Sequence, residues 1–287
     1  MEKGIILKGV GGIYKVQTEQ GLVPCTLRGR LRLEEKRIVV GDRVEISRQE
    51  SGGVVERILP RRTELQRPAI ANVEQVVVVF AVRKPEPNLL LLDRILVNAQ
   101  LAKIRSILVL NKEDLDQKRA RELQEIYKSI SYPVLITSAK KRKGLAELGQ
   151  LFPGKISTLA GPSGVGKSSL LNALNPGLDL EIKEVSMRAE RGRHTTRTVH
   201  LMPLNEGLVA DTPGFSQLTV DLSEKAELQF AFPEMAALAG QCRFRGCLHH
   251  REPGCAIKEA VRSGEIFNHR YNHYIVFLEE VQAIPNY

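Results

Sequence analysis

The chain has 287 residues, of which 43% are hydrophobic and 26% charged. These values are ordinary for soluble globular protein, and the length is enough for more than one domain. No apolar run approaches the roughly 18 residues of a membrane span. The start, MEKGIILKGVGG, also lacks the apolar stretch of a signal peptide. We therefore expect a cytoplasmic protein with no membrane association.

The formal net charge is +9, and it is unevenly distributed. Residues 1–67 hold 14 Lys and Arg against 9 acids, residues 68–222 hold 21 against 16, and residues 223–287 hold 7 against 8. One interpretation is a moderately basic protein with no special partner. The other, which the basic character of residues 1–222 favours, is a protein that binds a polyanion, most simply RNA.

Residues 1–67 contain five short strand-like runs separated by Gly-rich or charged turns. The runs are GIILKGV, IYKVQTE, VPCTLRG, DRVEIS and VVERIL, and the turns include VGG, EQG and SGG. Five short strands broken in this way predict a small β-barrel, of which the OB-fold is the commonest five-stranded case. Pro60 and the following RRTEL are typical of a linker that leaves this domain.

Residues 68–222 alternate between strands and helices. VEQVVVVFAV has the continuous apolar character of a strand buried on both faces, and LLLLDRILVNAQLA predicts a helix. A second helix is predicted from the helical spacing of Leu115, Leu123, Ile126, Tyr127 and Ile130, and further strands from SILVL, PVLIT, KISTLA and GLVA. This pattern predicts a doubly wound α/β domain that binds ligands at the carboxyl ends of its strands.

A phosphate-binding loop follows the strand ISTLA. Residues 161–168 read GPSGVGKS, which matches G-x-x-x-x-G-K-[ST] in full, and the helix SSLLNAL follows. Glycines let backbone N–H groups surround phosphates, Lys167 reaches the β and γ phosphates, and Ser168 can coordinate magnesium. The predicted nucleotide-binding residues here are Gly161, Pro162, Ser163, Gly164, Val165, Gly166, Lys167, Ser168 and Ser169.

Two loops that precede this one in the chain select the base. In Asn111-Lys112-Glu113-Asp114 the Asp114 carboxylate can accept hydrogen bonds from both the ring N–H and the amino group of guanine. Adenine has no ring N–H there and would leave a buried carboxylate unpaired. Ser138-Ala139-Lys140 follows PVLIT and can supply a backbone N–H to the guanine carbonyl. These loops argue against the alternative of a P-loop ATPase or small-molecule kinase.

Two further segments complete the nucleotide site. Asp211-Thr-Pro-Gly214 follows the strand GLVA, so the Asp211 carboxylate can hold a magnesium-bound water and the Gly214 N–H can contact the γ phosphate. Residues 188–198 read RAERGRHTTRT, in which Thr196, slightly preferred over Thr195, is the second candidate for magnesium. The four arginines of this segment are consistent with a solvated loop, with RNA contact or with phosphate sensing.

The catalytic group must differ from that of the common GTPases. In those enzymes a Gln after the D-x-x-G motif positions the attacking water, and here that position holds Phe215, which cannot. His194 can donate or accept a proton near neutral pH and is our catalytic candidate, with Lys167 and Thr196 beside the phosphates. The alternative for His194 is a structural or RNA-contacting role.

A cysteine cluster follows in a region predicted to be helical. CRFRGCLHHREPGC contains Cys242, Cys247 and Cys255, with two adjacent histidines, 249 and 250, between the last two cysteines. Three thiolates and one imidazole meet the tetrahedral preference of a single structural zinc ion. Free buried cysteines are the alternative, and spacing does not decide which histidine binds. Helices are expected at 223–239, at 256–264 and along an apolar stripe that consists of Phe267, Tyr271, Tyr274, Ile275, Leu278 and Val281.

The order NKED, SAK, GPSGVGKS, RHTT, DTPG is that of a circularly permuted GTPase. With a barrel in front and the Cys/His cluster behind, essentially the whole chain closely resembles the bacterial GTPases that depend on the small ribosomal subunit, the RsgA or YjeQ/YloQ type. The resemblance implies three domains: an OB-fold over 1–67, a permuted GTPase domain over 68–222 and a zinc-binding helical domain over 223–287. It also implies that His249, rather than His250, binds the zinc.

The same resemblance implies a function. The family acts in late maturation of the small (30S) subunit, and that subunit stimulates its GTPase activity; a switch-loop histidine that matches His194 has been proposed to be catalytic there. We expect rRNA binding, release of the protein on GTP hydrolysis, and a monomer. The alternative is a GTP-regulated RNA-binding assembly or translation factor whose hydrolysis is incidental. Because DTPG leads directly into the zinc-binding domain, a further hypothesis is that the γ phosphate controls the position of that domain.

Overall fold

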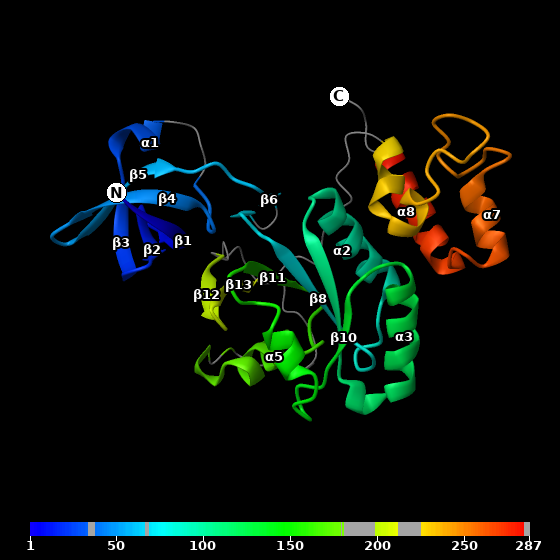
Figure 1. Cartoon of the computed structure of the whole chain (residues 1–287), viewed down its shortest axis with the longest axis horizontal. Coiled ribbons are helices and arrows are strands. Elements are labelled where there is room, and N and C mark those ends of the chain that lie inside the picture. Colours follow the sequence, from blue (N-terminus) through cyan, green and yellow to red (C-terminus); the bar gives the residue numbers. More distant parts are fainter. Residues whose placement is uncertain (34–37, 67–68, 179, 181–198, 212–224, 284–287) are drawn as a thin grey trace.

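The computed structural model describes residues 1–33, 38–66, 69–178, 180, 199–211 and 225–283. Its centre is a six-stranded sheet with helices on both faces. A small barrel lies at one end of this sheet, and a group of C-terminal helices lies at the other (Figure 1). The predicted succession of barrel, α/β domain and helical region is confirmed.

The barrel has five strands and closes in the order β1-β2-β3-β5-β4. The strands are β1 (Glu2–Val10), β2 (Ile13–Thr18), β3 (Gly21–Leu27), β4 (Arg43–Gln49) and β5 (Gly52–Ile58), and a short helix, α1 (Gly29–Leu33), follows β3. Each predicted strand overlaps an observed one, and the barrel is like an OB-fold. Val16, Val44 and Val55 fill its interior together with Cys25, which is buried as a core residue.

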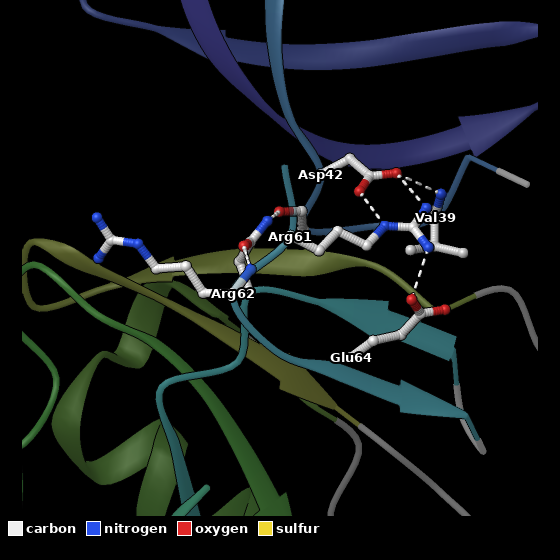
Figure 2. Close-up of polar contacts among 7 residues, drawn as sticks. Val39, Asp42, Arg61, Arg62 and Glu64 are labelled. Carbon is white, nitrogen blue, oxygen red and sulfur yellow. Dashed lines mark hydrogen bonds and ion pairs between the residues drawn. The ribbon is translucent and has the colours of Figure 1, made fainter. Parts of the chain in front are cut away.

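The segment after the barrel is more ordered than a linker. Arg61 donates from Nε and Nη2 to the two carboxylate oxygens of Asp42, at 2.7 and 2.9 Å, and from Nη1 to Glu64 at 2.8 Å (Figure 2). Asp42 is fully buried and also accepts the Val39 backbone N–H at 2.9 Å. The chain then forms a small hairpin of β6 (Glu64–Gln66) and β7 (Ala69–Ala71). This ion pair therefore fastens the exit segment to a corner of the barrel.

The central sheet has the strand order β10-β9-β8-β11-β13-β12. Its strands are β8 (Gln75–Ala81), β9 (Arg105–Asn111), β10 (Val134–Ile136), β11 (Ile156–Ala160), β12 (Leu201–Leu204) and β13 (Gly207–Asp211). The five predicted strands are parallel, whereas β12, which was not predicted, runs antiparallel at the edge. Because the strands are parallel, their carboxyl ends, where the sequence motifs lie, share one edge of the sheet.

Helices cover the two faces of the sheet through alternate residues of its strands. On one face Val76, Val78 and Phe80 pack in the cluster that includes α2 (Leu89–Leu101) and α3 (Gln117–Ser129). On the other face Val77 and Val79 pack with residues of α4 (Leu145–Gly149) and α5 (Lys167–Leu174). Leu115, which we predicted to belong to the second helix, instead lies before it and is 42% exposed.

The C-terminal region is helical, as predicted. It contains the 3-10 helix η3 (Lys225–Ala231), then α6 (Pro233–Ala236), α7 (Ala256–Ser263) and α8 (Asn268–Ala283). Tyr274, Leu278 and Val281 of the predicted stripe are buried in one core with Val97 of α2, so α8 packs directly on the central domain. Within the ranges that the structure describes, no helix is both long and apolar enough to cross a membrane.

A buried ionic cluster joins α8 to the central domain. The Arg270 side chain is 0% exposed, and its Nη1 lies 2.7 Å from Oδ1 of Asp93 on α2. Arg270 also donates from Nε to Glu234 of α6 at 2.6 Å. Asp93 accepts the Tyr127 hydroxyl at 2.8 Å, and Nδ1 of His273 lies 2.5 Å from its other oxygen. Burial raises the pKa of Asp93, but Arg270, His273 and Tyr127 together hold that pKa below its ordinary value.

Candidate functional site

The phosphate loop depends on glycine at two positions. At Gly161, φ is +134° and an added Cβ would lie 2.0 Å from the Val79 carbonyl oxygen. At Gly166, φ is +99° and a Cβ would lie 2.4 Å from Nδ2 of Asn111. Both values lie in the left-handed region that side chains disfavour. Only glycine lets this loop turn tightly between β11 and α5.

The loop brings the predicted phosphate-binding groups together at the N-terminus of α5. Lys167 begins that helix, and its Nζ donates to the carbonyl oxygens of Gly161 and Pro162, at 2.8 Å each. The ammonium group is therefore held beside the loop backbone. Ser168 and Ser169 follow in the first turn of the helix, while Val165 is buried in the core below. A helix N-terminus with a neighbouring lysine is a favourable place for phosphate.

Asn111 connects the phosphate loop with the two loops that are predicted to read the base. It is the last residue of β9 and is 1% exposed. Its Nδ2 donates to the Val165 carbonyl at 2.9 Å. Its Oδ1 accepts from the Thr137 hydroxyl at 3.2 Å and from the Ala139 backbone N–H at 3.3 Å. One side chain therefore contacts loops that lie far apart in sequence.

Lys112 makes a second connection of the same kind. Its Nζ donates to the Gly164 carbonyl at 2.6 Å and to the Lys84 carbonyl. Its backbone has φ of +61°, in the left-handed region. Burial lowers the pKa of the Lys112 ammonium, although the Asp114 carboxylate opposes this shift.

The loops that would read guanine lie together at the ends of β9 and β10. The Ser138 hydroxyl donates to Oδ1 of Asp114 and accepts the Lys141 backbone N–H at 3.1 Å. Ser138 and Lys143 exchange backbone hydrogen bonds of 3.1 and 3.0 Å, which close the loop that contains the exposed Lys140. The arrangement holds the Asp114 carboxylate in place from one side.

An ion pair that sequence reasoning missed lies across these loops. Nζ of Lys143 lies 2.5 Å from Oε1 of the buried Glu113, and the Glu113 backbone N–H donates to Thr137 at 3.1 Å. Glu113 occupies the variable third position of the NKED motif, so its residue type did not indicate an ion pair. The only available hint was the basic run KKRK after Ser138-Ala139.

The remaining predicted nucleotide-site residues are described in part or not at all. Asp211 ends β13, and its backbone is in register with Leu159 of β11, so it reaches the same edge of the sheet as the phosphate loop. Its side chain lies outside the described residues, as do Gly214, Phe215, His194 and the two candidate threonines, Thr195 and Thr196.

Four metal-ligating side chains lie together in the C-terminal region. One ligand atom from each of Cys242, Cys247, His249 and Cys255 lies within 4.8 Å of the others. The Cys242 and Cys255 sulfurs are 3.9 Å apart, and Nδ1 of His249 is 3.5 and 3.3 Å from these two sulfurs. A tetrahedral zinc ion with Zn–S distances of about 2.3 Å places its sulfur ligands about 3.8 Å apart. The donor set therefore fits one such ion.

The surroundings of His249 suit a neutral imidazole ligand. Its Nδ1 faces the sulfurs, and its Nε2 lies 2.9 Å from Oε1 of Gln229, an outer contact that orients a metal-binding ring. Burial lowers the pKa of His249. Burial also raises the pKa of the Cys247 thiol, to about 12, so binding of a cation there would release a proton. No pattern in the sequence indicated that Gln229 would contact His249.

Comparisons with known proteins agree with this geometry. The family model described as RsgA GTPase matches residues 58–221, and that described as RsgA N-terminal domain matches residues 3–55. The chain is 51% identical to the small ribosomal subunit biogenesis GTPase RsgA of Moorella thermoacetica and 46% identical to that of Shouchella clausii. Each match covers 98% of both chains.

Solved structures give the same result. YjeQ from Thermotoga maritima is 40% identical with a TM-score of 0.87, over 99% of both chains. YloQ, described as a circularly permuted GTPase, is 38% identical with a TM-score of 0.84, over 100% of this chain and 97% of the other. The predicted guanine-reading loops, the phosphate loop and the matches along the full length lead to one conclusion. The chain belongs to the RsgA family of circularly permuted GTPases.

Proposed function

We propose that this protein hydrolyses GTP in late maturation of the small ribosomal subunit and that the subunit stimulates its turnover. The observation that carries the proposal is the convergence of the base-reading loops and the phosphate loop on Asn111. Relatives that match along their full length are named small ribosomal subunit biogenesis GTPases. The basic charge of residues 1–222 supports rRNA as the partner.

The nucleotide-binding roles follow from the chemistry of each group. Asp114 reads the guanine base, and the loop Ser138-Ala139-Lys140 offers a backbone N–H to the guanine carbonyl. Lys167 neutralises the β and γ phosphates, and Ser168 coordinates magnesium together with Thr196. The magnesium ion would draw charge from the phosphates, while the chain's own loops hold the nucleotide and exclude adenine.

Two further residues, Asp211 and Gly214, act near the γ phosphate. Asp211 holds a magnesium-bound water, and Gly214 donates its backbone N–H to the phosphate. The placement of the Asp211 backbone beside the phosphate-loop strand supports this role.

We also propose that the boundaries of the three domains are 1–67, 68–222 and 223–287. One structural zinc ion is held by the cysteine and histidine cluster of the last domain.

We further propose that the protein is a cytoplasmic monomer, that it contacts rRNA on the subunit and that GTP hydrolysis releases it. His194 acts as the general base or orients the attacking water, because Phe215 cannot replace the usual glutamine. General acid–base groups of this kind contribute typically about 10²–10⁴-fold to a rate.

The test is GTP turnover of the full chain with and without purified small subunits. We expect stimulation in the wild type, and no stimulation would refute the proposal in favour of a binding factor with incidental hydrolysis. His194→Ala should retain GTP affinity but lose about 10²-fold or more of the stimulated rate. The matched control is His200→Ala, which removes an exposed histidine near the same segment and should leave turnover unchanged. Equal rates for both variants would remove His194 from catalysis.

A further inference from the structure

The metal-binding cluster displays an aromatic side chain to solvent. Phe244 lies between the first two cysteines and is 45% exposed. Among the described residues, the exposed large hydrophobic side chains include two aromatic ones, Phe244 and Phe230, both in the C-terminal region. Burying a phenylalanine stabilises a fold, so an exposed ring forgoes much of that contribution. The Phe244 ring is therefore accessible to a binding partner.

A guanidinium group is held beside this ring. The Arg243 guanidinium carbon lies over the Phe244 ring, 5.5 Å from its centroid. The Arg243 backbone N–H donates to the Gly254 carbonyl at 3.0 Å. Its side-chain carbons pack against Gly254, where an added Cβ would lie 3.0 Å from the Arg243 Cβ. The Arg243 backbone is thus anchored to the other side of the loop, and its exposed guanidinium lies next to the ring.

The surroundings of the ring are positively charged. Residues 242–255 contain three arginines and a single acid, Glu252. The Glu252 carboxylate accepts the backbone N–H groups of Leu248 and His250, both at 3.0 Å, so its charge is engaged within the loop. Arg245, next to Phe244, is exposed. An aromatic face with adjacent cations complements a nucleobase and its phosphates, because bases stack on aromatic rings while arginines pair with the backbone.

We propose that Phe244 is a stacking platform for one unpaired base of RNA, with Arg243 and Arg245 beside the neighbouring phosphates. This inference rests on the proposed function in one respect, that the natural RNA is the rRNA of the small subunit. We favour RNA over a protein partner because residues 242–255 carry three arginines against a single acid whose carboxylate is already engaged, a charge balance that suits a polyanion. Metal binding would fix the loop that carries the ring.

The first test is affinity for purified small subunits in the presence of a non-hydrolysable GTP analogue. Loss of one stacked base costs about 1–3 kcal/mol, so Phe244→Ala should bind about 5- to 150-fold more weakly. Phe244→Tyr keeps an aromatic face and should restore most of the affinity. The matched control, Phe230→Ala, removes the other exposed ring and should bind as the wild type does. Zinc content per chain verifies that each variant retains the cluster.

Equal affinity of Phe244→Ala and the wild type would overturn the inference and leave the proposed function intact. A photocrosslink from Phe244→p-azidophenylalanine gives a second readout. A crosslink to an unpaired rRNA nucleotide is expected, whereas a crosslink to a ribosomal protein or to a base-paired nucleotide would refute stacking.

A third measurement keeps the inference testable if the wild type fails to bind subunits. It compares a short single-stranded adenosine oligonucleotide with an abasic oligonucleotide of the same length and charge. The wild type should prefer the probe with bases, and Phe244→Ala should lose that preference. The same preference in both proteins would overturn the inference regardless of what the natural partner is.

Discussion

Replacement of Arg270 by methionine should reveal how strongly the C-terminal helices are held on the GTPase domain. Arg270 is fully buried and pairs with Asp93 and Glu234, whose side chains are 0% and 6% exposed. Arg270→Met keeps much of the aliphatic length but removes the cation that the buried Glu234 and Asp93 share, and leaves Asp93 with His273 and Tyr127. Breaking a buried ion pair by removing one partner costs about 3–5 kcal/mol. We expect a loss of this size in the free energy of unfolding.

A second ion pair across the same two helices provides the control. Arg94 of α2 pairs with Glu280 of α8, but the two side chains are 15% and 40% exposed. Because solvent screens exposed pairs, Glu280→Gln should cost only about 0.2–1 kcal/mol. The contrast between the two variants separates the effect of burial from that of charge pairing as such.

Urea unfolding followed by tyrosine fluorescence suits this measurement. The chain has no tryptophan and six tyrosines, and Tyr127, Tyr132, Tyr271 and Tyr274 belong to or pack against the apolar clusters on the two sides of α2. With a slope of about 1–3 kcal/mol/M, Arg270→Met should lower the midpoint by about 1 M or more. Equal midpoints for Arg270→Met and Glu280→Gln would refute the reasoning.

The comparison should be made at neutral pH, because the contribution of Asp93 depends on pH. Its pKa in the folded protein is below the ordinary value of about 3.9. The stabilisation that ionised Asp93 contributes is therefore fully present when the pH is above its ordinary pKa. It is lost as the pH falls through its lower pKa in the folded protein.

Three further variants test the nucleotide site and the metal cluster. Asp114→Asn should exchange guanine preference for xanthine in a competition assay, and unchanged GTP affinity would show that another group reads the base. Gly166→Ala should weaken GTP binding about tenfold or more, because its Cβ would lie 2.4 Å from a side-chain amide of the base-reading loop. Gly154→Ala, also at positive φ but with no atom within 4 Å, is its control and should bind normally. Cys247→Ser should lose the metal and loosen the C-terminal helices, whereas Cys25→Ser, in the barrel core, should retain one metal per chain by elemental analysis.

Motifs whose chemistry fixes residue types at a fixed spacing could be predicted from the sequence. The phosphate loop needs glycine where φ is positive, and the sequence shows glycine at 161 and 166. The five barrel strands were predicted because short strand-like runs are separated by Gly-rich or charged turns, and the buried strand β8 because its residues are uniformly apolar. The cysteine cluster was predicted because its potential ligands lie close together in the chain.

Contacts between distant segments could not be predicted in the same way. The short edge strand β12 contains Pro203 and only four residues, which is too few for a periodic pattern. Arg61 was interpreted as part of a linker, since the sequence does not show that the Asp42 carboxylate is buried beside it. The ion pair of Glu113 with Lys143 was missed for the same reason.

The sequence by itself determined that this chain is a permuted GTPase, because the order of NKED and GPSGVGKS along the chain does not affect how these two loops meet at the edge of the sheet. The tertiary structure alone decided how the three parts are joined. A charged residue such as Arg270 in a helix ordinarily indicates a solvent-facing position. Its burial is possible only because Asp93 and Glu234, from two other helices, neutralise it there. Pairing of this kind depends on the folded arrangement of helices rather than on any local pattern.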